Sequence, residues 1–324
     1  MRKTIFLILL AFNFSGCGIL TDMSDNIRRE FLEIDTVSNK LNNFYSDSVR
    51  LSALWVGHET VLLQMDDKVI ITDPFFTENI AMLQRRIIEA GYDLKNLNKL
   101  DFILLSHSHF DHTNLGSLGL LEKKFPTAKL IFPEGLEYFL PDYTFDFIPM
   151  KKADEKNKVY IGESKIIDGV KFTAVAAFHW GGRYGLDGLI WGYDSYSAYI
   201  IEYNGIKVFF AGDTSYDEDF SDFLGQNYSF DISILPVGPC SDCEGEGKPY
   251  RHIYPEGVVK MMERLKSDSY IIVHYGTIKE KSEPDFPKEV LVNLLDKKPN
   301  LKAKVKFLKI GEQLIQITRV EKNK

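Results

Sequence analysis

A short segment rich in histidine and aspartate follows an apolar run of the sequence. His107, His109, Asp111 and His112 come directly after the apolar run 102–105, and such a run is typical of a buried strand that delivers its end to a site. In an extended segment His107 and His109 point to the same side and can reach one metal ion, while Asp111 and His112 can reach a second position nearby. The chain has seven histidines, so three in one window favour a metal site over a chance polar loop.

Three more candidate ligands follow apolar runs elsewhere in the chain. His179 comes after the run 175–178, His274 comes after the run 270–273, and Asp213 ends a strand that runs into a glycine turn. A single histidine after a strand is more often a hydrogen-bonded core residue, but three separate segments with this pattern indicate ligands delivered to a common edge by a rigid scaffold.

The pattern of the remaining sequence predicts alternating strands and helices around these residues. The expected strands are 51–56, 60–65, 68–73, 101–106, 129–132, 171–176, 198–202, 207–210, 231–235, 270–273, 305–308 and 313–318. The expected helices are 26–36, 77–90, a short one near His112, 216–224, 255–266 and 287–297. This order indicates two mixed sheets packed face to face with helices outside, although periodicity alone does not separate that layout from other α/β folds.

The motifs together resemble those of the metallo-β-lactamase superfamily, which has an H-x-H-x-D-H sequence followed by later His, Asp and His ligands. The similarity covers about residues 51–318 and is closest to the branch of N-acyl-phosphatidylethanolamine-hydrolysing phospholipase D and the L-ascorbate-6-phosphate lactonase-like proteins. The matching pieces are Trp55–Thr60, Thr72–Pro74, His179-Trp180, Phe210–Thr214, His252-x-x-Pro255-Glu256 and His274–Thr277. The resemblance implies an α/β chain with a four-layer αββα sandwich.

The same resemblance implies a site for two divalent metal ions. His107, His109 and His179 would hold the first ion, whereas Asp111, His112 and His274 would hold the second, with Asp213 as the bridge. Zinc is the expected metal because neutral imidazoles and a carboxylate suit it, although iron and manganese accept the same ligands.

Two such ions would activate a bridging hydroxide for hydrolysis. This chemistry indicates a hydrolase but does not identify the bond that is cleaved. The expected function is a phosphodiesterase of phospholipase D-like type, acting on a phospholipid or a small phosphodiester. A lactonase of the ascorbate-phosphate lactonase type is the alternative among hydrolases. A non-hydrolytic di-iron or metal-binding module is the alternative from a different class.

Roles beyond the metal ligands are assigned to six residues. Asp111 and His252 are the predicted catalytic residues, with His252 protonating a leaving group or gripping a substrate oxygen instead of only capping a helix. Asp73 is expected to orient a ligand histidine. His58, Arg183 and Tyr184 are candidate substrate contacts, and Arg183 could clamp a phosphate bidentately. The alternatives without a functional role are a turn residue for Asp73, a buried structural histidine for His58 and a surface charge for Arg183.

The N-terminus has the layout of a secretory signal. Arg2 and Lys3 precede the apolar run 5–12, and Ser15-Gly16-Cys17 resembles the lipobox of bacterial lipoproteins. We therefore expect a signal peptide at 1–16, lipidation of Cys17, a tether and lead-in helix at 17–50 and a metallo-hydrolase domain at 51–320. The alternative is an ordinary signal peptide in which Cys17 is incidental. The prediction is an exported, membrane-anchored lipoprotein of the periplasm or cell surface.

The bulk composition agrees with one large folded domain that does not bind nucleic acid. The chain has 324 residues, of which 44% are hydrophobic and 26% charged, which suffices for a sizeable core. Its net charge is −7, and loss of Arg2 and Lys3 with the signal would make it −9, which excludes a typical nucleic-acid binder. Cys240 and Cys243 could form a short disulfide or half of a zinc site, and we expect a local structural role.

Overall fold

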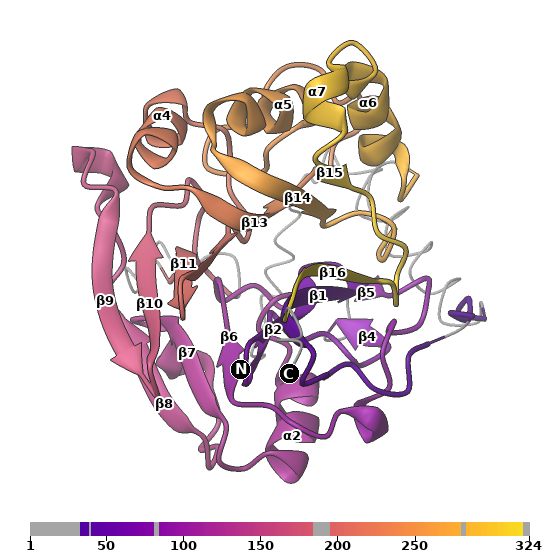
Figure 1. Ribbon diagram of the computed structural model, residues 1–324, viewed down its shortest axis with the longest axis vertical. Helices are drawn as coiled ribbons and strands as arrows, with labels where there is room; N and C mark the ends of the chain where they lie inside the picture. The colour runs from indigo at the N-terminus through magenta and orange to yellow at the C-terminus, as the bar shows by residue number, and fades with distance from the viewer. Residues whose placement is uncertain (1–32, 39, 81–83, 184–194, 280–282, 320–324) are drawn as a thin grey trace, which may run out of the picture.

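Two seven-stranded sheets form the centre of the protein, as the computed structural model shows for residues 33–38, 40–80, 84–183, 195–279 and 283–319 (Figure 1). The first sheet has the order β16 (Gln313–Thr318), β1 (Val49–Gly57), β2 (Thr60–Met65), β3 (Lys68–Thr72), β6 (Phe102–Leu104), β7 (Lys129–Pro133) and β8 (Asp146–Met150). The second has the order β15 (Val305–Lys306), β14 (Ser267–Val273), β13 (Phe230–Pro236), β12 (Ile206–Phe210), β11 (Ala198–Tyr203), β10 (Val170–Val175) and β9 (Ile161–Ile167).

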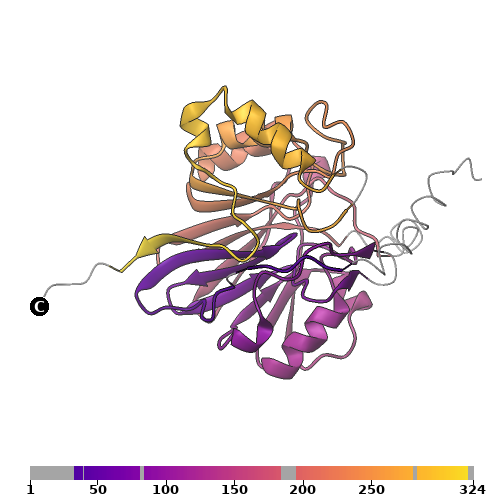
Figure 2. The same ribbon diagram turned by 90° about the vertical axis from the view of Figure 1, so that its right-hand side faces the viewer.

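Helices cover the outer face of each sheet, so that the molecule has four layers (Figure 2). Beside the first sheet lies α2 (Leu115–Lys124), and beside the second lie α4 (Glu218–Asn227), α5 (Pro255–Arg264), α6 (Phe286–Leu295) and α7 (Pro299–Lys302). Short 3-10 helices are η1 (Leu94–Asn96), η2 (Leu136–Phe139) and η3 (Glu155–Asn157). This arrangement is the predicted αββα sandwich.

Alternate side chains of the first sheet enter two different hydrophobic clusters. Trp55 and Val61 point into the core between the sheets, where they join Phe172 of the second sheet. Leu54 belongs to the outer cluster, together with Leu118 of α2. Because both faces of the strands are buried, their sequences are almost continuously apolar and do not alternate with polar residues.

The prediction of a helix at 77–90 was wrong. This segment contains a small hairpin of β4 (Asn79–Ile80) and β5 (Gln84–Arg85). Ile80 packs with Phe75 and Ile278 in a small separate cluster, and the side chain of Arg86 is buried. These long-range contacts override the local helical preference, which is only a weak determinant of structure.

Besides β4 and β5, the strands β8 and β9 were missed because they lie at the edges of the sheets. β8 contains Pro149 and β9 has a largely half-exposed pattern, both of which are features of edge strands with weak hydrophobic patterns. The predicted helix at 26–36 falls mostly outside the described residues, and its described part, 33–36, is not helical. The other predicted elements occur within a few residues of their expected ends.

The two cysteines of the C-x-x-C segment form a disulfide, Cys240–Cys243. They pack with Tyr254, which immediately precedes α5. Their role is therefore local and structural, as expected. Cys17 and the apolar run 5–12 lie outside the described residues. Within the part of the chain that the structure describes, no helix has both the length and the apolar character needed to cross a bilayer.

Candidate metal centre

All seven histidines of the chain lie in one group between the two sheets. Neighbouring rings contact one another, with centroid separations from 4.0 Å for His107 and His112 to 5.5 Å for His252 and His274. The first sheet supplies His58 from the β1–β2 turn and the ligand loop 106–114 that follows β6. The second sheet supplies ligands that follow β10, β12 and β14, which explains why the candidate residues are far apart in sequence.

The first predicted set of ligands is assembled. His109 Nδ1 lies 2.8 Å from His107 Nε2 and 3.3 Å from His179 Nε2. The nearest carboxylate oxygen of Asp213 lies 4.0 Å from His107 and 3.8 Å from His179. These four residues offer ligand atoms that all lie within 4.8 Å of one another, a separation that suits a tetrahedral metal site.

The second predicted set is also assembled, and it includes one further histidine. Asp111, His112 and His274 group with His58, again within 4.8 Å. Asp111 Oδ2 lies 3.4 Å from His112 Nε2 and 3.0 Å from His58 Nε2. His58, which the sequence suggested as a substrate contact, thus belongs geometrically to the second metal position.

Asp213 lies between the two sets. Its Oδ1 is 3.1 Å from His274 Nε2, and its Oδ2 is 3.4 Å from His112 Nε2. It follows Gly212, which has a φ of +53°, and a side chain there would place its Cβ 2.5 Å from the Ser106 Cβ. Only glycine therefore allows the Asp213 turn to approach the ligand loop so closely.

Several atoms of the centre are buried without hydrogen bonds. His112 Nε2, His274 Nε2 and Asp213 Oδ1 form none with the described residues. Buried polar atoms normally have partners, because an unsatisfied one costs free energy. Imidazole nitrogens and carboxylate oxygens directed at one another in this way are the donors that divalent zinc-like ions take. The residues present therefore fit the two-metal site that the sequence implies.

The protonation states also suit metal binding. Burial lowers the pKa of His58 to about 3 and that of His109 to about 4, which keeps both imidazoles neutral. Burial raises the pKa of Asp213, but His274 and His112 outweigh it, so the pKa is well below the usual value. Burial likewise opposes charge on His274, yet Asp213 raises its pKa to about 9. Ions that replace those protons would bind the deprotonated ligands.

Asp73 lies behind the ligands and contacts both the loop and a histidine. Its Oδ2 is 2.8 Å from His112 Nδ1, and its Oδ1 accepts a hydrogen bond from the Ser106 amide at 2.7 Å. Ser106 Oγ lies 2.5 Å from Asp73 and 2.9 Å from His107 Nδ1. This geometry is the one in which a carboxylate fixes the orientation of ligand histidines. Ser106 had no predicted role, although its place directly before His107 is a signal for one.

His252 lies at the rim of the centre. Its Nδ1 is 3.4 Å from Asp213 Oδ2, and its side chain is 26% exposed, so it is open to solvent while touching a ligand. Burial lowers its pKa to about 4. The preceding residue, Arg251, accepts a hydrogen bond from His179 Nδ1 at its carbonyl oxygen. Its guanidinium lies over the Trp180 ring, 4.9 Å from the centroid.

Arg183 lies behind the ligand loop. Its Nη1 donates hydrogen bonds of 2.9 Å to the carbonyl oxygens of Ser108 and Thr113, and its guanidinium lies over the Phe110 ring. The side chain is buried. It therefore holds the loop, a position different from that of the predicted phosphate clamp. Tyr184, the neighbouring candidate, lies outside the described residues.

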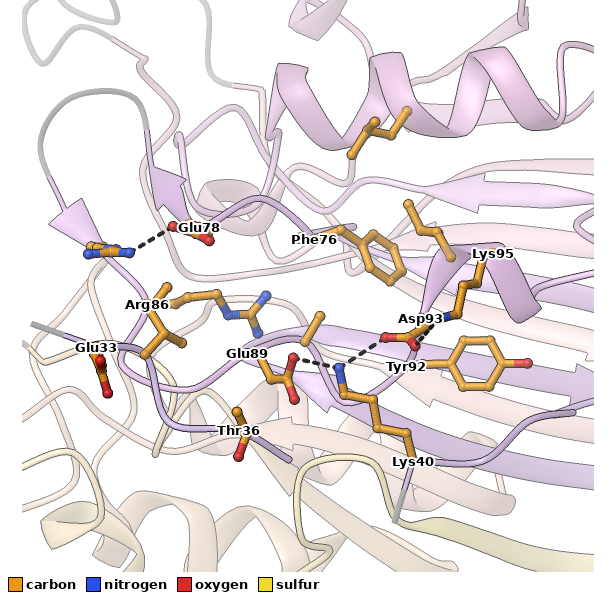
Figure 3. A pocket seen from close by; sticks show the side chains of 15 residues that line it. Glu33, Thr36, Lys40, Phe76, Glu78, Arg86, Glu89, Tyr92, Asp93 and Lys95 are labelled. Carbon is orange, nitrogen blue, oxygen red and sulfur yellow. Dashed lines mark hydrogen bonds and ion pairs between the residues drawn. The ribbon is translucent and has the colours of Figure 1, made fainter. Parts of the chain in front are cut away.

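A cavity of about 770 Å³ lies apart from the histidines (Figure 3). Several of its charged side chains pair with one another, since Lys40 lies 2.8 Å from Glu89 and 3.0 Å from Asp93. Arg85 pairs with Glu78 in the same way. None of the candidate metal ligands lines this cavity, so its volume does not bear on the chemistry of the centre.

Known proteins with similar sequences include hydrolases that are described as metal-dependent. An N-acyl-phosphatidylethanolamine-hydrolyzing phospholipase D of Caenorhabditis elegans is 25% identical, over 81% of this chain and 74% of that protein. A metal-dependent hydrolase of Archaeoglobus fulgidus is 28% identical, over 80% of this chain and 96% of that protein. The match to an uncharacterized protein of Mycobacterium tuberculosis spans 63% of that protein's length.

Solved structures and a family model agree with the architecture. The structure of a metallo hydrolase from Ignicoccus hospitalis superposes with a TM-score of 0.58 at 20% identity, covering 82% of this chain and 97% of that one. The similarity at this identity concerns the fold. The family model for the beta-lactamase superfamily domain matches residues 68–275, which is more than half of the sequence and contains every predicted metal ligand. The chain therefore belongs to the beta-lactamase superfamily.

Proposed function

We propose that this protein is a metal-dependent hydrolase, and specifically a phosphodiesterase of phospholipase D-like type. The observation that carries the proposal is the position of Asp213 between two sets of ligands, one centred on His109 and one on His112. The curated relatives that include N-acyl-phosphatidylethanolamine-hydrolyzing phospholipases D support the choice of bond.

In this proposal His107, His109 and His179 would hold the first ion. Asp111, His112 and His274 would hold the second. Two divalent cations at these positions would lower the pKa of a water between them and stabilise negative charge on a phosphoryl group. Zinc remains the first expectation. Asp213 would contact both ions, and Asp73 would keep the His112 ring in the orientation that binding requires.

His252 and Arg251 would act on the substrate. His252 is partly exposed and touches Asp213. A bound phosphodiester anion would raise its pKa from about 4 and let it hold a proton within reach of the leaving oxygen. Arg251 lies over Trp180, whose ring is 4.5 Å from that of His109. Its guanidinium would therefore face an anionic oxygen of a phosphodiester at the mouth of the centre, whereas the buried Arg183 holds the loop.

The test is a comparison of substrates with purified, zinc-loaded protein. Hydrolysis of bis-p-nitrophenyl phosphate and of N-acyl-phosphatidylethanolamine in vesicles is the expected result, with little turnover of an acyl-homoserine lactone or a chromogenic cephalosporin. Good lactone hydrolysis without phosphodiester hydrolysis would assign the lactonase activity instead. Metal analysis tests the non-hydrolytic alternative. Tightly held iron with a redox-active spectrum would favour a di-iron module over a hydrolase.

The proposed location at a membrane fits a lipid substrate. We propose that Cys17 is lipidated after removal of residues 1–16 and that the catalytic domain is tethered there. Cell fractionation tests this directly: the wild-type protein is expected with membranes, and Cys17→Ala is expected in the soluble fraction. Equal membrane association of both forms would contradict the proposal that a lipid on Cys17 anchors the protein.

A further inference from the structure

The segment 237–254 carries two residues of the rim but contains neither a helix nor a longer strand. It runs from the end of β13 to the start of α5 and includes Arg251 and His252. From Glu244 to Arg251 every residue except Gly247 is exposed. A surface segment is ordered only when its contacts offset the loss of conformational entropy, and exposed polar residues supply few such contacts. The order of this segment therefore depends on the residues near its two ends.

The disulfide Cys240–Cys243 provides the packed part of the segment. Both cysteines are buried, and they form a small cluster with Tyr254 at the other end of the segment and with side chains of α6. The amide of Gly238 also donates a 2.9 Å hydrogen bond to the carbonyl oxygen of Ile253. A disulfide reduces the conformations open to the chain around it. The bond thus helps to hold the beginning of the segment against its end.

Backbone hydrogen bonds connect the exposed part of the segment to this packed end. The amide of Tyr254 donates to the carbonyl oxygen of Glu246 at 3.0 Å, and the amide of Lys248 donates to that of His252 at 3.1 Å. A single hydrogen bond of this kind contributes little to stability by itself. The position of the exposed part therefore depends on the cluster around the disulfide, to which these bonds connect it.

Two contacts join the segment to the predicted metal ligands. The carbonyl oxygen of Arg251 accepts a 2.6 Å hydrogen bond from His179 Nδ1, and His252 Nδ1 lies 3.4 Å from Asp213 Oδ2. A histidine that binds a metal through one nitrogen almost always donates the N–H of the other to a carboxylate, a carbonyl or water, which fixes its ring. A displaced segment would therefore release the orientation of His179 as well as move His252.

We propose that the Cys240–Cys243 disulfide, beyond joining two neighbouring residues, is a positioning element of the metal centre. The inference rests on the metal centre of the proposed function and not on the bond that is cleaved. Reduction by a dithiol transfers two electrons and two protons, so that the S–S bond becomes two thiols and the dithiol becomes a disulfide. The thiols no longer constrain the segment, and Arg251 and His252 lose their placement. Full activity accordingly requires an oxidising compartment, in agreement with the proposed export.

Two forms without the bond test this proposal. The double variant Cys240→Ser, Cys243→Ser removes it with little change in volume. Wild-type protein reduced with a dithiol is the second form, and the dithiol is removed without air before measurement because thiolates bind zinc themselves. All proteins compared carry Cys17→Ala, so that no other cysteine is present.

Trypsin reports the position of the segment in the absence of metal. Lys248 precedes a proline, and trypsin does not cut such a bond, so Arg251–His252 is the reporting bond of the segment. With chelator present, we expect cleavage there to be at least about tenfold faster in both forms without the disulfide, because the segment opens more often. Mass spectrometry of the fragments identifies the bond that is cut.

Zinc affinity tests the link from the segment to the ligands. In competition with a chromophoric chelator, we expect the first zinc ion to bind about tenfold more weakly or worse without the disulfide, with the second affinity unchanged, because His179 loses its partner. With cobalt in place of zinc, the visible spectrum of the first site should change. Asp66→Asn is the control for general stability, because Asp66 binds Arg50 at the β2–β3 turn. It should leave zinc affinity and cleavage after Arg251 unchanged.

The proposal is overturned if the double variant keeps the trypsin resistance and the first zinc affinity of the oxidised protein. Faster cleavage with an unchanged zinc affinity also overturns it, because the disulfide would then order the segment without positioning a ligand. Should circular dichroism show that the double variant does not fold, the reduced wild type decides both measurements. A protein that shows both effects but hydrolyses no phosphodiester would contradict the proposed function and leave the role of the disulfide standing.

Discussion

His58 Nε2 lies 3.0 Å from Asp111 Oδ2, so a residue of the β1–β2 turn contacts a predicted ligand of the second metal. The two side chains differ in exposure, since that of His58 is 3% exposed and that of Asp111 is 23% exposed. The buried histidine therefore restrains the more open carboxylate. Its φ of +53° and the hydrogen bond from its amide to Thr277 show that the turn is held in this conformation by its surroundings.

Replacement of His58 by alanine tests whether it serves the metal or the substrate. We expect the second zinc to bind about 10–100-fold more weakly, because Asp111 loses its restraint. The loss of kcat should be recovered by excess zinc, with KM unchanged. A raised KM at full metal content would instead return His58 to the substrate-contact role suggested by the sequence.

Asp213→Ala should affect both metal positions, because Asp213 is the residue shared by the two sets of ligands. Zinc content should fall from two ions per chain to fewer than one, and activity should fall by at least about a hundredfold. Elemental analysis after dialysis measures the first effect. As a comparison, the wild type treated with chelator should lose activity and recover it on addition of zinc, whereas the variant should not recover.

The proton-donor role of His252 predicts an effect that depends on the leaving group. His252→Gln should lower kcat by about 10²–10⁴-fold for phosphodiesters with alkoxide leaving groups, and by much less for p-nitrophenyl esters, whose leaving group needs no proton. Zinc content should stay at the wild-type value. An equal loss for both classes of substrate would show that His252 acts by holding Asp213 or the substrate.

Arg251→Gln distinguishes an anionic substrate from a neutral one. If the guanidinium over Trp180 contacts a phosphodiester, KM for that substrate should rise about tenfold or more, since a charge-assisted hydrogen bond is lost. Hydrolysis of a neutral lactone, where it is measurable, should not change. Lys248→Gln is the control, because Lys248 is an exposed cation three residues away and should have little effect on either substrate.

A polar cluster far from the histidines predicts how stability depends on pH. Arg50 of β1 donates to both carboxylate oxygens of Asp66, at 2.9 and 3.1 Å, and also to the carbonyl oxygen of Asn204 in the β11–β12 turn. The hydrogen bond from Arg50 lowers the pKa of Asp66. A carboxyl group whose pKa is lower in the folded state stabilises the fold above its unfolded pKa of roughly 4 and loses that contribution as the pH falls through the folded value.

Asp66→Asn should therefore lower the free energy of unfolding by about 1–3 kcal/mol at pH 7. The difference from the wild type should shrink as the pH falls below about 4, where both forms lack the charge. Denaturant unfolding at several pH values measures this. A difference that is independent of pH would mean that the amide is accommodated poorly for steric reasons.

The ligands could be predicted from sequence because each follows a buried strand. The runs before His107, His179 and His274 are apolar on both faces, since helices cover the outside and the other sheet covers the inside. A polar, metal-binding residue directly after such a run is unusual on packing grounds alone. The strand pattern and the types of the following residues were therefore enough to predict the metal centre from the sequence.

Other features depend on contacts that no local pattern encodes. The segment 77–90 has suitable spacing for a helix, but Ile80 is needed in a cluster with Ile278, two hundred residues away in the chain. Arg183 looked like a surface charge or a phosphate clamp, yet it is buried and its Nη1 donates to backbone carbonyls of the ligand loop.

The division of the donor atoms between the two sheets has a consequence for the stability of the native protein and its resistance to proteolysis. Neither sheet alone carries a full set, because His179, Asp213 and His274 come from the second and the other ligands from the first. Cations that bind only the complete set will favour the native chain over the unfolded one, and more strongly as their free concentration rises. Metal supply would then govern how long the chain survives proteolysis as well as how fast it works.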